Sequence, residues 1–281
     1  MKPIEEQIVL ITGATDGIGR LTAHELARQG ATVLVHGRNP DRVDATAAAI
    51  RTTTDPDNVK GFIADFEALA SVRQLAKDIS AVHPSLDVII NNAGIGAGGI
   101  DHQERTLSQD GYELRFAVNY LAPFLLTHLL LPNLRRVESA RIVNVASAGQ
   151  HPLDFADVML TQGFIGRRAY GQSKLAQIMF TFELAERLRG SGITVNCHHP
   201  GSLLDTKMVR ETFGQPWGKP ESGAEAEVYL AASPAVADVT GQYFDQTTIA
   251  RANPQAYDPQ ARLKLWELSE QLTGITEPIP S

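Results

Sequence analysis

Residues 8–19 read Ile-Val-Leu-Ile-Thr-Gly-Ala-Thr-Asp-Gly-Ile-Gly, and this stretch decides the fold of the 281-residue chain. Its first four residues are apolar and mostly β-branched, which is typical of a strand buried on both faces. Glycines follow at once, and a helical pattern then runs from Ile18 to Arg28 and ends at Gly30. Glycines placed there let the backbone approach a pyrophosphate at the helix N-terminus. The spacing G-x-x-x-G-x-G is not the common G-x-G-x-x-G, so nucleotide binding is predicted from position, with a loop of small residues as the alternative.

The alternation of strand and helix continues to the end of the chain. Strands are expected at 32–36, 59–64, 86–90, 140–146, 193–198 and 241–244, and helices at 41–52, 68–82, 108–135, 168–188, 221–232 and 258–272. Such alternation predicts a parallel sheet with helices on both faces. No composition shift or repeat divides the chain, so 1–281 is predicted to form a single α/β domain. Its fold would be a Rossmann-type, doubly wound parallel sheet of about seven strands.

The composition narrows the classes of function. The chain is 43% hydrophobic and 20% charged, as is ordinary for a globular protein. A net charge of -7 without a run of Lys or Arg argues against nucleic acid or an anionic membrane as partner. The single cysteine, Cys197, excludes an internal disulfide and fits a reducing compartment. We see no signal peptide and no window of about 18 uncharged apolar residues, so a cytoplasmic protein without a membrane anchor is expected.

The end of the second expected strand bears on the choice of cofactor. An acidic residue there would hold the adenosine ribose hydroxyls of NAD and repel the 2′-phosphate of NADP. The chain has His-Gly-Arg-Asn at 36–39 instead. Arg38 can clamp a phosphate, with Arg20 as a second candidate, although Arg38 could also be a solvated turn residue. Asp16 argues the other way because it puts negative charge near the phosphates. The sequence therefore favours NADP (NADPH) over NAD.

Polar residues at later positions suggest further contacts and an acid/base. Asp65 could accept a hydrogen bond from the adenine amino group, and Asn-Asn-Ala-Gly at 91–94 lies at the ligand-binding edge, although it could equally be a turn. Tyr170 and Lys174 stand one helical turn apart on the same face. An ammonium favours phenolate over phenol, whose ordinary pKa is about 10. The pair is a candidate acid/base, although a solvated helix face would look the same.

Several positions, taken in order, complete a recognisable set. They are Thr12-Gly13-x-x-x-Gly17-Ile18-Gly19, Asp65, Asn91-Asn92-Ala93-Gly94, Asn119, Ser147, Tyr170-x-x-x-Lys174 and Pro200-Gly201. With them, the chain resembles the short-chain dehydrogenase/reductase superfamily over nearly its whole length. It looks most like the retinol-dehydrogenase-like and WW-domain-oxidoreductase-like branch. The resemblance implies an NADP(H)-dependent oxidoreductase that reduces a ketone or aldehyde, or oxidises the alcohol.

The resemblance also implies a role for each catalytic position. Tyr170 would donate a proton to the substrate oxygen in reduction and act as the base in oxidation. Lys174 would bind the nicotinamide ribose hydroxyls and lower the pKa of Tyr170. Ser147 would hold the substrate carbonyl, and Asn119 would anchor a water that connects Lys174 to solvent. These roles agree with the need to stabilise an alkoxide as the hydride is transferred.

The predicted cofactor contacts come from the glycine loop, the strand ends and the resemblance. They are Gly13, Thr15, Asp16, Gly17, Ile18, Gly19, Arg38, Asn39, Asp65, Phe66, Asn91, Asn92, Ala93, Gly94, Tyr170, Lys174, Pro200, Gly201 and Thr206. Thr206 rests on a Pro-Gly-x-x-x-Thr pattern that is one residue longer here than is common. No Cys, His and carboxylate set has zinc spacing, and adjacent His198 and His199 would point to opposite faces of a strand, so no metal is predicted.

Two segments, at about 147–167 and 202–220, are predicted to form the substrate site. Ser147 and Tyr170 lie 23 positions apart, more than in many members of the superfamily. The extra stretch is rich in apolar residues and can line an enlarged pocket, with His151 as a further candidate. A surface excursion without substrate contact is the alternative. We therefore expect a lipophilic or polycyclic small-molecule substrate.

Two other functions are compatible with the fold. An epimerase or dehydratase could act through a transient ketone, but such enzymes are usually longer and carry T-G-x-x-G-x-x-G. A catalytically inactive NADP-binding regulatory protein is the alternative from another class, and it is disfavoured because all four catalytic positions are filled. The resemblance further implies a homodimer or homotetramer built on the long helices at 108–135 and 168–188.

Overall fold

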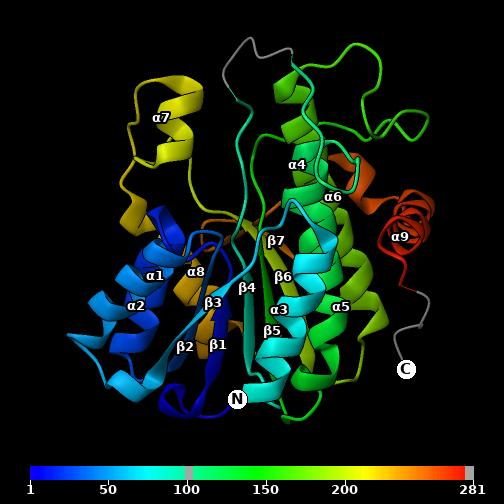
Figure 1. Ribbon diagram of the computed structural model, residues 1–281. Helices are drawn as coiled ribbons and strands as arrows, with labels where there is room; N and C mark the ends of the chain where they lie inside the picture. The colour runs from blue at the N-terminus through cyan, green and yellow to red at the C-terminus, as the bar shows by residue number, and fades with distance from the viewer. Residues whose placement is uncertain (99–103, 276–281) are drawn as a thin grey trace.

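The computed structural model describes residues 1–98 and 104–275 and places eight strands in one sheet (Figure 1). The strands are β1 (Ile8–Ile11), β2 (Thr32–Gly37), β3 (Val59–Ile63), β4 (Val88–Asn91), β5 (Ala140–Val145), β6 (Ile193–His199), β7 (Tyr243–Asp245) and β8 (Thr248–Ala250). Their order in the sheet is β3-β2-β1-β4-β5-β6-β7-β8. The strands from β1 to β7 run parallel, and β8 pairs antiparallel with β7.

The doubly wound α/β fold expected from the sequence is confirmed. The chain adds strands outward from β1 to β3 and then returns to place β4 on the other side of β1. The direction of winding therefore reverses between β1 and β4, which is where ligands bind in sheets of this kind. The additional strand, β8, was not predicted because it has only three residues, after a turn in which Gln246 has a φ of 54°.

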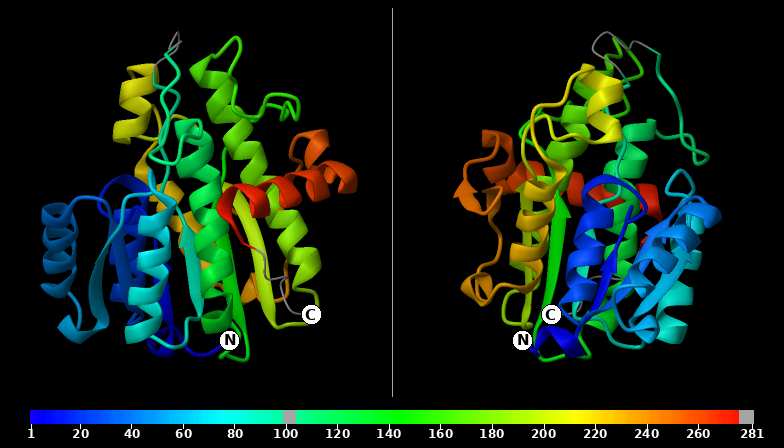
Figure 2. Two further views of the ribbon diagram at one scale, coloured as in Figure 1. Left: turned by 45° about the vertical axis from the view of Figure 1, so that its right-hand side comes forward. Right: turned by 90° about the vertical axis from the view of Figure 1, so that its left-hand side faces the viewer.

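Helices cover both faces of the sheet (Figure 1, Figure 2). One face carries α1 (Gly17–Arg28), α2 (Pro40–Arg51) and α8 (Pro220–Ala232), and the other carries α3 (Leu69–Val82), α5 (Ala122–Leu134) and α6 (Gly166–Arg187). Two short helices are α4 (Leu114–Phe116) and α7 (Lys207–Phe213), and α9 (Pro259–Thr273) packs on α6. Short 3-10 turns occur at Ile4–Glu6, Pro56–Asn58, Pro234–Val236 and η5 (Pro254–Tyr257).

The helix expected at 108–135 begins later than predicted. A β-bridge joins Leu107 to Glu113, so the chain turns before the helix starts. The Glu113 carboxylate then accepts a hydrogen bond from the Phe116 amide at 2.8 Å and caps α4. Between α4 and α5, the turn Ala117–Leu121 is π-helical, a widening often found at functional sites. This turn carries the candidate residue Asn119.

One stretch of the described chain, Leu114–Leu134, is long and apolar enough by composition to cross a membrane. The expectation that no such window exists is therefore wrong. In this structure 83% of its most apolar window is buried inside the protein, against neighbours that include α3 and α6. A helix that is hydrophobic all round is typical of a protein core as well as of a membrane span, and here it is a core helix.

The helix α9 covers the outer side of α5 and α6, where the sequence predicted a subunit contact. The Trp266 indole is 2% exposed and lies 5.3 Å from the Phe124 ring and 6.1 Å from the Phe180 ring. The Arg187 guanidinium lies over the same indole at 4.1 Å. Such ring and cation contacts add to the free energy of apolar burial. The two long helices are thus covered by the chain itself.

Candidate active site

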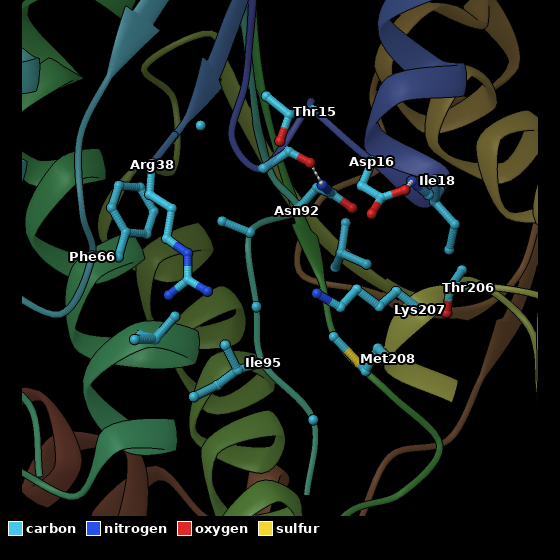
Figure 3. Close-up of a pocket in the computed structure, with 18 of the residues that line it drawn as sticks. Thr15, Asp16, Ile18, Arg38, Phe66, Asn92, Ile95, Thr206, Lys207 and Met208 are labelled. Atoms are coloured by element: carbon cyan, nitrogen blue, oxygen red, sulfur yellow. Dashed lines mark hydrogen bonds between the residues drawn. The ribbon is translucent and has the colours of Figure 1, made fainter. Parts of the chain in front are cut away.

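A cavity of about 540 Å³ opens at the carboxyl ends of β1, β4 and β5 (Figure 3). The predicted residues that line it are Gly13, Thr15, Asp16, Gly17, Ile18, Arg38, Asn39, Asp65, Phe66, Asn92, Ala93, Gly94, Tyr170, Lys174, Pro200 and Thr206. Gly19, Asn91, Asn119, Ser147 and Gly201 are not among the lining residues. We call the part lined by Arg38 and Asp65 the adenine end, and the part lined by Tyr170 and Lys174 the catalytic end.

The glycine loop gives the cavity a floor made of backbone. Gly13 has a φ of 66°, and a Cβ on it would lie 2.8 Å from the Ala93 Cα atom, so a side chain does not fit there. The Asp16 carboxylate caps α1 by accepting a hydrogen bond from the Gly17 amide at 2.8 Å. The next amides of the first turn have no partner within the helix. A helix N-terminus in this position is suited to a diphosphate.

Gly19 supports the loop from behind. A Cβ on Gly19 would lie 2.3 Å from the Asn92 Nδ2 atom. That atom donates hydrogen bonds to the carbonyl oxygens of Thr12 and Gly13 at 2.8 and 3.1 Å. The absence of a side chain on Gly19 therefore lets α1 pack against Asn92, which fixes the loop between β1 and α1.

Asn91 and Gly201 also have structural positions. Asn91 is fully buried, and its amide donates to Thr127 Oγ1 at 3.1 Å and to Asn144 Oδ1 at 2.8 Å. The Asn91 side chain thus points into the core and away from the cavity, which leaves only its backbone for the predicted contact with the cofactor. Gly201 has a φ of 126°, and a Cβ on it would lie 3.1 Å from the Leu204 Cδ2 atom. A residue with a side chain would be strained there, so Gly201 shapes the turn after β6.

His36 joins the glycine loop to the adenine end. Its Nδ1 atom accepts a hydrogen bond from the Gly13 amide at 3.3 Å, and its Nε2 atom lies 3.1 Å from the Ala64 carbonyl oxygen. Burial lowers the pKa of His36 to about 4, so the ring is neutral with its proton on Nε2. The ring stacks on Phe66 at 4.6 Å, which positions Phe66 as a wall of the adenine end beside Asp65.

Two arginines line the adenine end, and each is paired with a carboxylate. The Arg38 guanidinium lies 3.4 Å from Glu67 Oε1, and its side chain is 66% exposed. The Arg42 guanidinium lies 2.8 Å from Asp16 Oδ2 and donates to the Thr15 carbonyl oxygen at 3.1 Å. Arg42 was not predicted, although its position four residues after Arg38 was a signal in the sequence.

The end of β2 has no room for an acidic side chain. A Cβ on Gly37 would lie 2.5 Å from the Thr15 Cγ2 atom and 3.1 Å from a methyl group of Val43. A carboxylate that could hold ribose hydroxyls therefore does not fit at this position without a shift of Thr15. Arg20, the second phosphate candidate, does not line the cavity.

Tyr170 lies at the catalytic end, beside Ser147. The Ser147 Oγ atom accepts a hydrogen bond from the Gly149 amide at 3.0 Å, and Ser147 Oγ and the Tyr170 ring lie on the same side of Gly149, 3.5 and 3.7 Å from where its Cβ would be. Burial raises the pKa of Tyr170, and the neighbouring Ser147 hydroxyl opposes this shift. Lys174 Nζ lies 5.9 Å from the centre of the Tyr170 ring and donates to the Val145 carbonyl oxygen, and a lowering of the Tyr170 pKa by its charge stays a prediction.

Lys174 is almost fully buried behind the phenol. It is 3% exposed, and its ammonium donates to the Val145 carbonyl oxygen at 2.7 Å and to Gln177 Oε1 at 3.4 Å. Burial lowers the pKa of Lys174 to about 8, against the opposing charge of Glu227. The backbone thus holds the ammonium in place. Its pKa of about 8 means that it loses its proton only slightly above neutral pH.

Asn119 is fixed by the π turn between α4 and α5. Its Oδ1 atom accepts from the Ile95 amide at 2.8 Å, and its Nδ2 atom donates to the Ile95 carbonyl oxygen at 3.1 Å and to Ser173 Oγ at 2.9 Å. A Cβ on Gly94 would lie 3.2 Å from Asn119 Oδ1 and 3.6 Å from Lys174 Nζ. The structure thus brings Asn119 next to Lys174, and its link to a water stays a prediction.

The segment 202–220 closes over the cavity and contains α7, although no regular element was predicted there. The Thr206 hydroxyl caps this helix by accepting a hydrogen bond from the Val209 amide. Met208 and Thr212 pack against the glycine-rich loop at Gly96, where a Cβ would lie 2.8 and 2.9 Å from them. The segment is therefore a lid with a helical core.

Several lining residues besides Arg42 were not predicted. They include Ile95, Arg115 and Val118, whereas Lys207, Met208, Glu211 and Thr212 lie within the predicted segment 202–220 without having been singled out. A capping Thr before helix-forming residues was the available signal for α7. Arg115 is 5% exposed and donates to the carbonyl oxygens of Gly96 and Ala97 at 3.1 and 2.8 Å, and it is paired with Glu113 at 3.1 Å. We find no sequence signal for it, because its partners come together only in the fold.

No residue of the segment 147–167 lines this cavity, and its contact with the substrate stays a prediction. The segment makes contacts with η5 and α9. The Leu153 amide donates to Gln255 Oε1 at 2.7 Å, and the Lys264 ammonium lies 4.9 Å from the Phe155 ring centre. Two parts of the segment reach residues that line the cavity: Gly149 lies against Tyr170, and the Phe164 ring lies 5.5 Å from the Arg115 guanidinium.

Comparison with known proteins agrees with this geometry. Residues 7–217 match the family model for short chain dehydrogenases. Human retinol dehydrogenase 13 is 36% identical over 98% of this chain and 87% of its own length. Retinol dehydrogenase 14 of Mus musculus is 38% identical over 95% of this chain and 86% of its own length.

Solved structures show the same likeness. An uncharacterized protein from Mycobacterium Paratuberculosis superposes with a TM-score of 0.80 at 33% identity, over 98% of this chain and 96% of that chain. A short chain dehydrogenase from Escherichia coli CFT073, complexed with NADPH, has a TM-score of 0.71 at 30% identity, over 86% and 96%. This chain therefore belongs to the short-chain dehydrogenase family, in its retinol-dehydrogenase-like branch, and is an oxidoreductase of alcohol and carbonyl groups.

Proposed function

We propose that this protein uses NADP(H) to reduce a ketone or an aldehyde of a lipophilic small molecule, or to oxidise the alcohol, with Tyr170 as general acid and base. One observation carries the proposal. At the catalytic end, the Tyr170 phenol lies beside Ser147, and the buried Lys174 ammonium lies behind it. A proton donor and a fixed positive charge thus line the cavity at its catalytic end, with the hydroxyl of Ser147 beside the proton donor.

The residues of the cavity fit a nicotinamide dinucleotide. Gly13 and Gly17 have positive φ and leave the floor free of side chains, next to the α1 N-terminus. At the adenine end, Arg38 and Arg42 suit a 2′-phosphate, and Gly37 leaves no room for a carboxylate, which favours NADP(H) over NAD(H). The neighbour from Escherichia coli CFT073 was solved with NADPH. When bound, the nicotinamide would supply or accept the hydride.

The chain's own residues would handle the proton. In reduction, negative charge develops on the substrate oxygen, and the Tyr170 hydroxyl donates its proton to that atom while Ser147 holds it by a hydrogen bond. The raised pKa keeps the phenol protonated and ready to donate. The Lys174 ammonium then stabilises the phenolate that is left. In oxidation, the same groups act in reverse order.

The lid side of the cavity favours a lipophilic substrate. Ile95, Val118 and Met208 contribute apolar surface there. The charge of Arg115 is already satisfied by Glu113 and by two backbone carbonyl groups, so it does not call for an anionic substrate. The relatives named retinol dehydrogenases would, by their name, act on a long apolar alcohol, and we extend that class to this chain.

The covered faces of α5 and α6 favour a protein that works without a partner on those helices. Phe124, Phe180 and Trp266 are 2% exposed or less within one chain, so a second subunit would find little apolar surface to bury there. Size-exclusion chromatography with light scattering should give the mass of one chain. A dimer that persists at micromolar concentration would contradict this part of the proposal.

Consumption of NADPH with a panel of carbonyl compounds tests the proposed function. Long apolar aldehydes and ketones should be reduced with NADPH, short polar ones more slowly, and NADH should be the poorer cofactor by about tenfold. A protein that binds NADPH tightly but turns over no aldehyde, ketone or alcohol of the panel would be a regulatory protein instead, and the proposal would fail.

A further inference from the structure

We propose that Arg42 is a second ligand of the 2′-phosphate of NADP(H), and that Asp16 competes with the phosphate for Arg42 and so limits the selection of NADPH. The inference rests on the proposed use of NADP(H). It gives a function to Asp16, an acidic residue inside a phosphate-binding loop. Apart from its role as the cap of α1, such a residue would be expected to repel the cofactor.

The geometry ties Arg42 to the glycine loop. Arg42 lies in the first turn of α2, where its amide donates to the Asn39 side chain at 3.0 Å. Its guanidinium reaches across the edge of the cavity to Asp16 Oδ2 at 2.8 Å and to the Thr15 carbonyl oxygen at 3.1 Å. The other oxygen of Asp16 is used by the Gly17 amide. The Asp16 carboxylate is therefore fixed at the N-terminus of α1, and the long Arg42 side chain is the member of the pair that can change its partner.

The pair is open enough to exchange partners. The side chains of Arg42 and Asp16 are 47% and 50% exposed, and both residues line the cavity. An exposed ion pair of this kind contributes little to stability. A phosphate can accept two parallel hydrogen bonds from a guanidinium, as a carboxylate can, and it carries more negative charge, about -1.5 to -2 near pH 7. The Arg42 side chain can therefore turn from Asp16 to a phosphate bound near Arg38.

Charge at the adenine end makes this competition specific for NADP(H). Arg38 is paired with Glu67 and Arg42 with Asp16, so two guanidinium groups face two carboxylates. A 2′-phosphate has to draw these arginines away from their carboxylates, and it does so against the charge of Asp16. NADH has no group at this position, so the pair should hardly affect its binding. Asp16 should therefore lower the ratio of the affinity for NADPH to the affinity for NADH.

Four variants test the proposal through dissociation constants for NADPH and NADH. Asp16→Asn keeps the helix cap, because Asn caps as well as Asp, and Arg42→Gln removes the guanidinium. The double variant tests whether the two residues act together. Glu25→Gln is the matched control, because Glu25 holds Arg28 on the same helix at 2.7 Å outside the cavity. Adenosine 2′,5′-bisphosphate and 5′-AMP serve as fragments with and without the 2′-phosphate.

The expected changes differ in sign. Asp16→Asn should tighten NADPH binding about threefold, and Arg42→Gln should weaken it about tenfold. The double variant should match Arg42→Gln, and NADH and 5′-AMP should change less than twofold throughout. Glu25→Gln should leave the NADPH-to-NADH ratio as in the wild type. The 2′,5′-bisphosphate should follow NADPH.

Several results would overturn the proposal. The proposal fails if Asp16→Asn changes the dissociation constants for NADPH and NADH by the same factor. It also fails if Asp16→Asn still tightens NADPH binding in the double variant, where Arg42 is replaced by Gln. A wild type that prefers NADPH, together with an Arg42→Gln variant that binds it unchanged, would leave the proposed cofactor intact and remove only the role of Arg42. A wild type that binds NADH as tightly as NADPH would instead contradict the proposed cofactor itself.

Discussion

At the adenine end of the cavity, Arg38 and Arg42 have side chains that are 66% and 47% exposed, and each is paired with a carboxylate. At the catalytic end, Lys174 is 3% exposed and Asn119 is fully buried, and both are held by hydrogen bonds to the backbone. Ion pairs in water contribute little to stability and exchange easily. Buried polar groups are costly to leave without partners.

The difference assigns separate tasks to the two ends. Changes at the adenine end should alter the choice of cofactor and leave folding as it is. Changes at the catalytic end should alter turnover, and those that leave a buried group without a partner should also reduce stability. The following predictions test that division, from the largest expected effect to the smallest.

Lys174→Met removes the buried ammonium and keeps a side chain of similar length. The rate constant kcat should fall about 100-fold, because the phenolate of Tyr170 loses its neighbouring charge. The thermal unfolding midpoint should also fall, because the buried Val145 carbonyl oxygen and Gln177 Oε1 atom lose their donor. Lys77→Met on the exposed side of α3 is the control. A kcat within threefold of the wild type would show that the ammonium is not needed.

Arg38→Gln removes one of the two guanidinium groups from the adenine end. The ratio of kcat/KM for NADPH to that for NADH should fall about tenfold, because the 2′-phosphate loses a charge-assisted ligand. The unfolding midpoint should stay unchanged, since the ion pair with Glu67 is largely exposed. If the ratio stays constant, the phosphate is held elsewhere. If the midpoint drops, the proposed separation of tasks fails.

The pH dependence of turnover should report Lys174. Burial lowers its pKa to about 8, so the ammonium is charged below that pH and loses its charge as the pH rises through it. The phenol of Tyr170, whose pKa is raised, stays protonated over this range. The kcat for reduction should therefore fall about threefold between about pH 7.5 and 8.5. The Lys174→Met variant should not show this fall of kcat with rising pH. If it does, a group other than Lys174 titrates in this range.

The sequence predicted the fold well because the buried strands leave a clear pattern. β1 is apolar throughout and β4 is apolar up to its last residue, Asn91, and glycines mark the turn after β1. The sequence did not predict two short elements whose formation depends on tertiary contacts. β8 has three residues and forms only by pairing with β7, and α7 has seven residues packed against Gly96. Neither is long enough for periodicity to reveal it.

The site shows where sequence reasoning stops. Neighbouring residues at a strand end point in opposite directions, so Asn91 and Asn92 cannot both face the ligand. Only the structure shows that Asn91 points into the core and that Asn92 holds the glycine loop. The apolar residues of 151–165 indicate burial, but not that this segment contacts η5 and α9. The pairing of Asp16 with Arg42 joins α1 to α2 and depends on the fold.

Tyr170→Phe, assayed for both turnover and NADPH binding in one preparation, tests the central claim most directly. Phe lacks the hydroxyl group beside Ser147 but fills the same space. We expect kcat to fall about 1,000-fold with the dissociation constant for NADPH unchanged within twofold, because the proton donor is lost and the cofactor contacts are kept. Turnover at the wild-type rate would contradict the assignment of Tyr170 as the general acid and base.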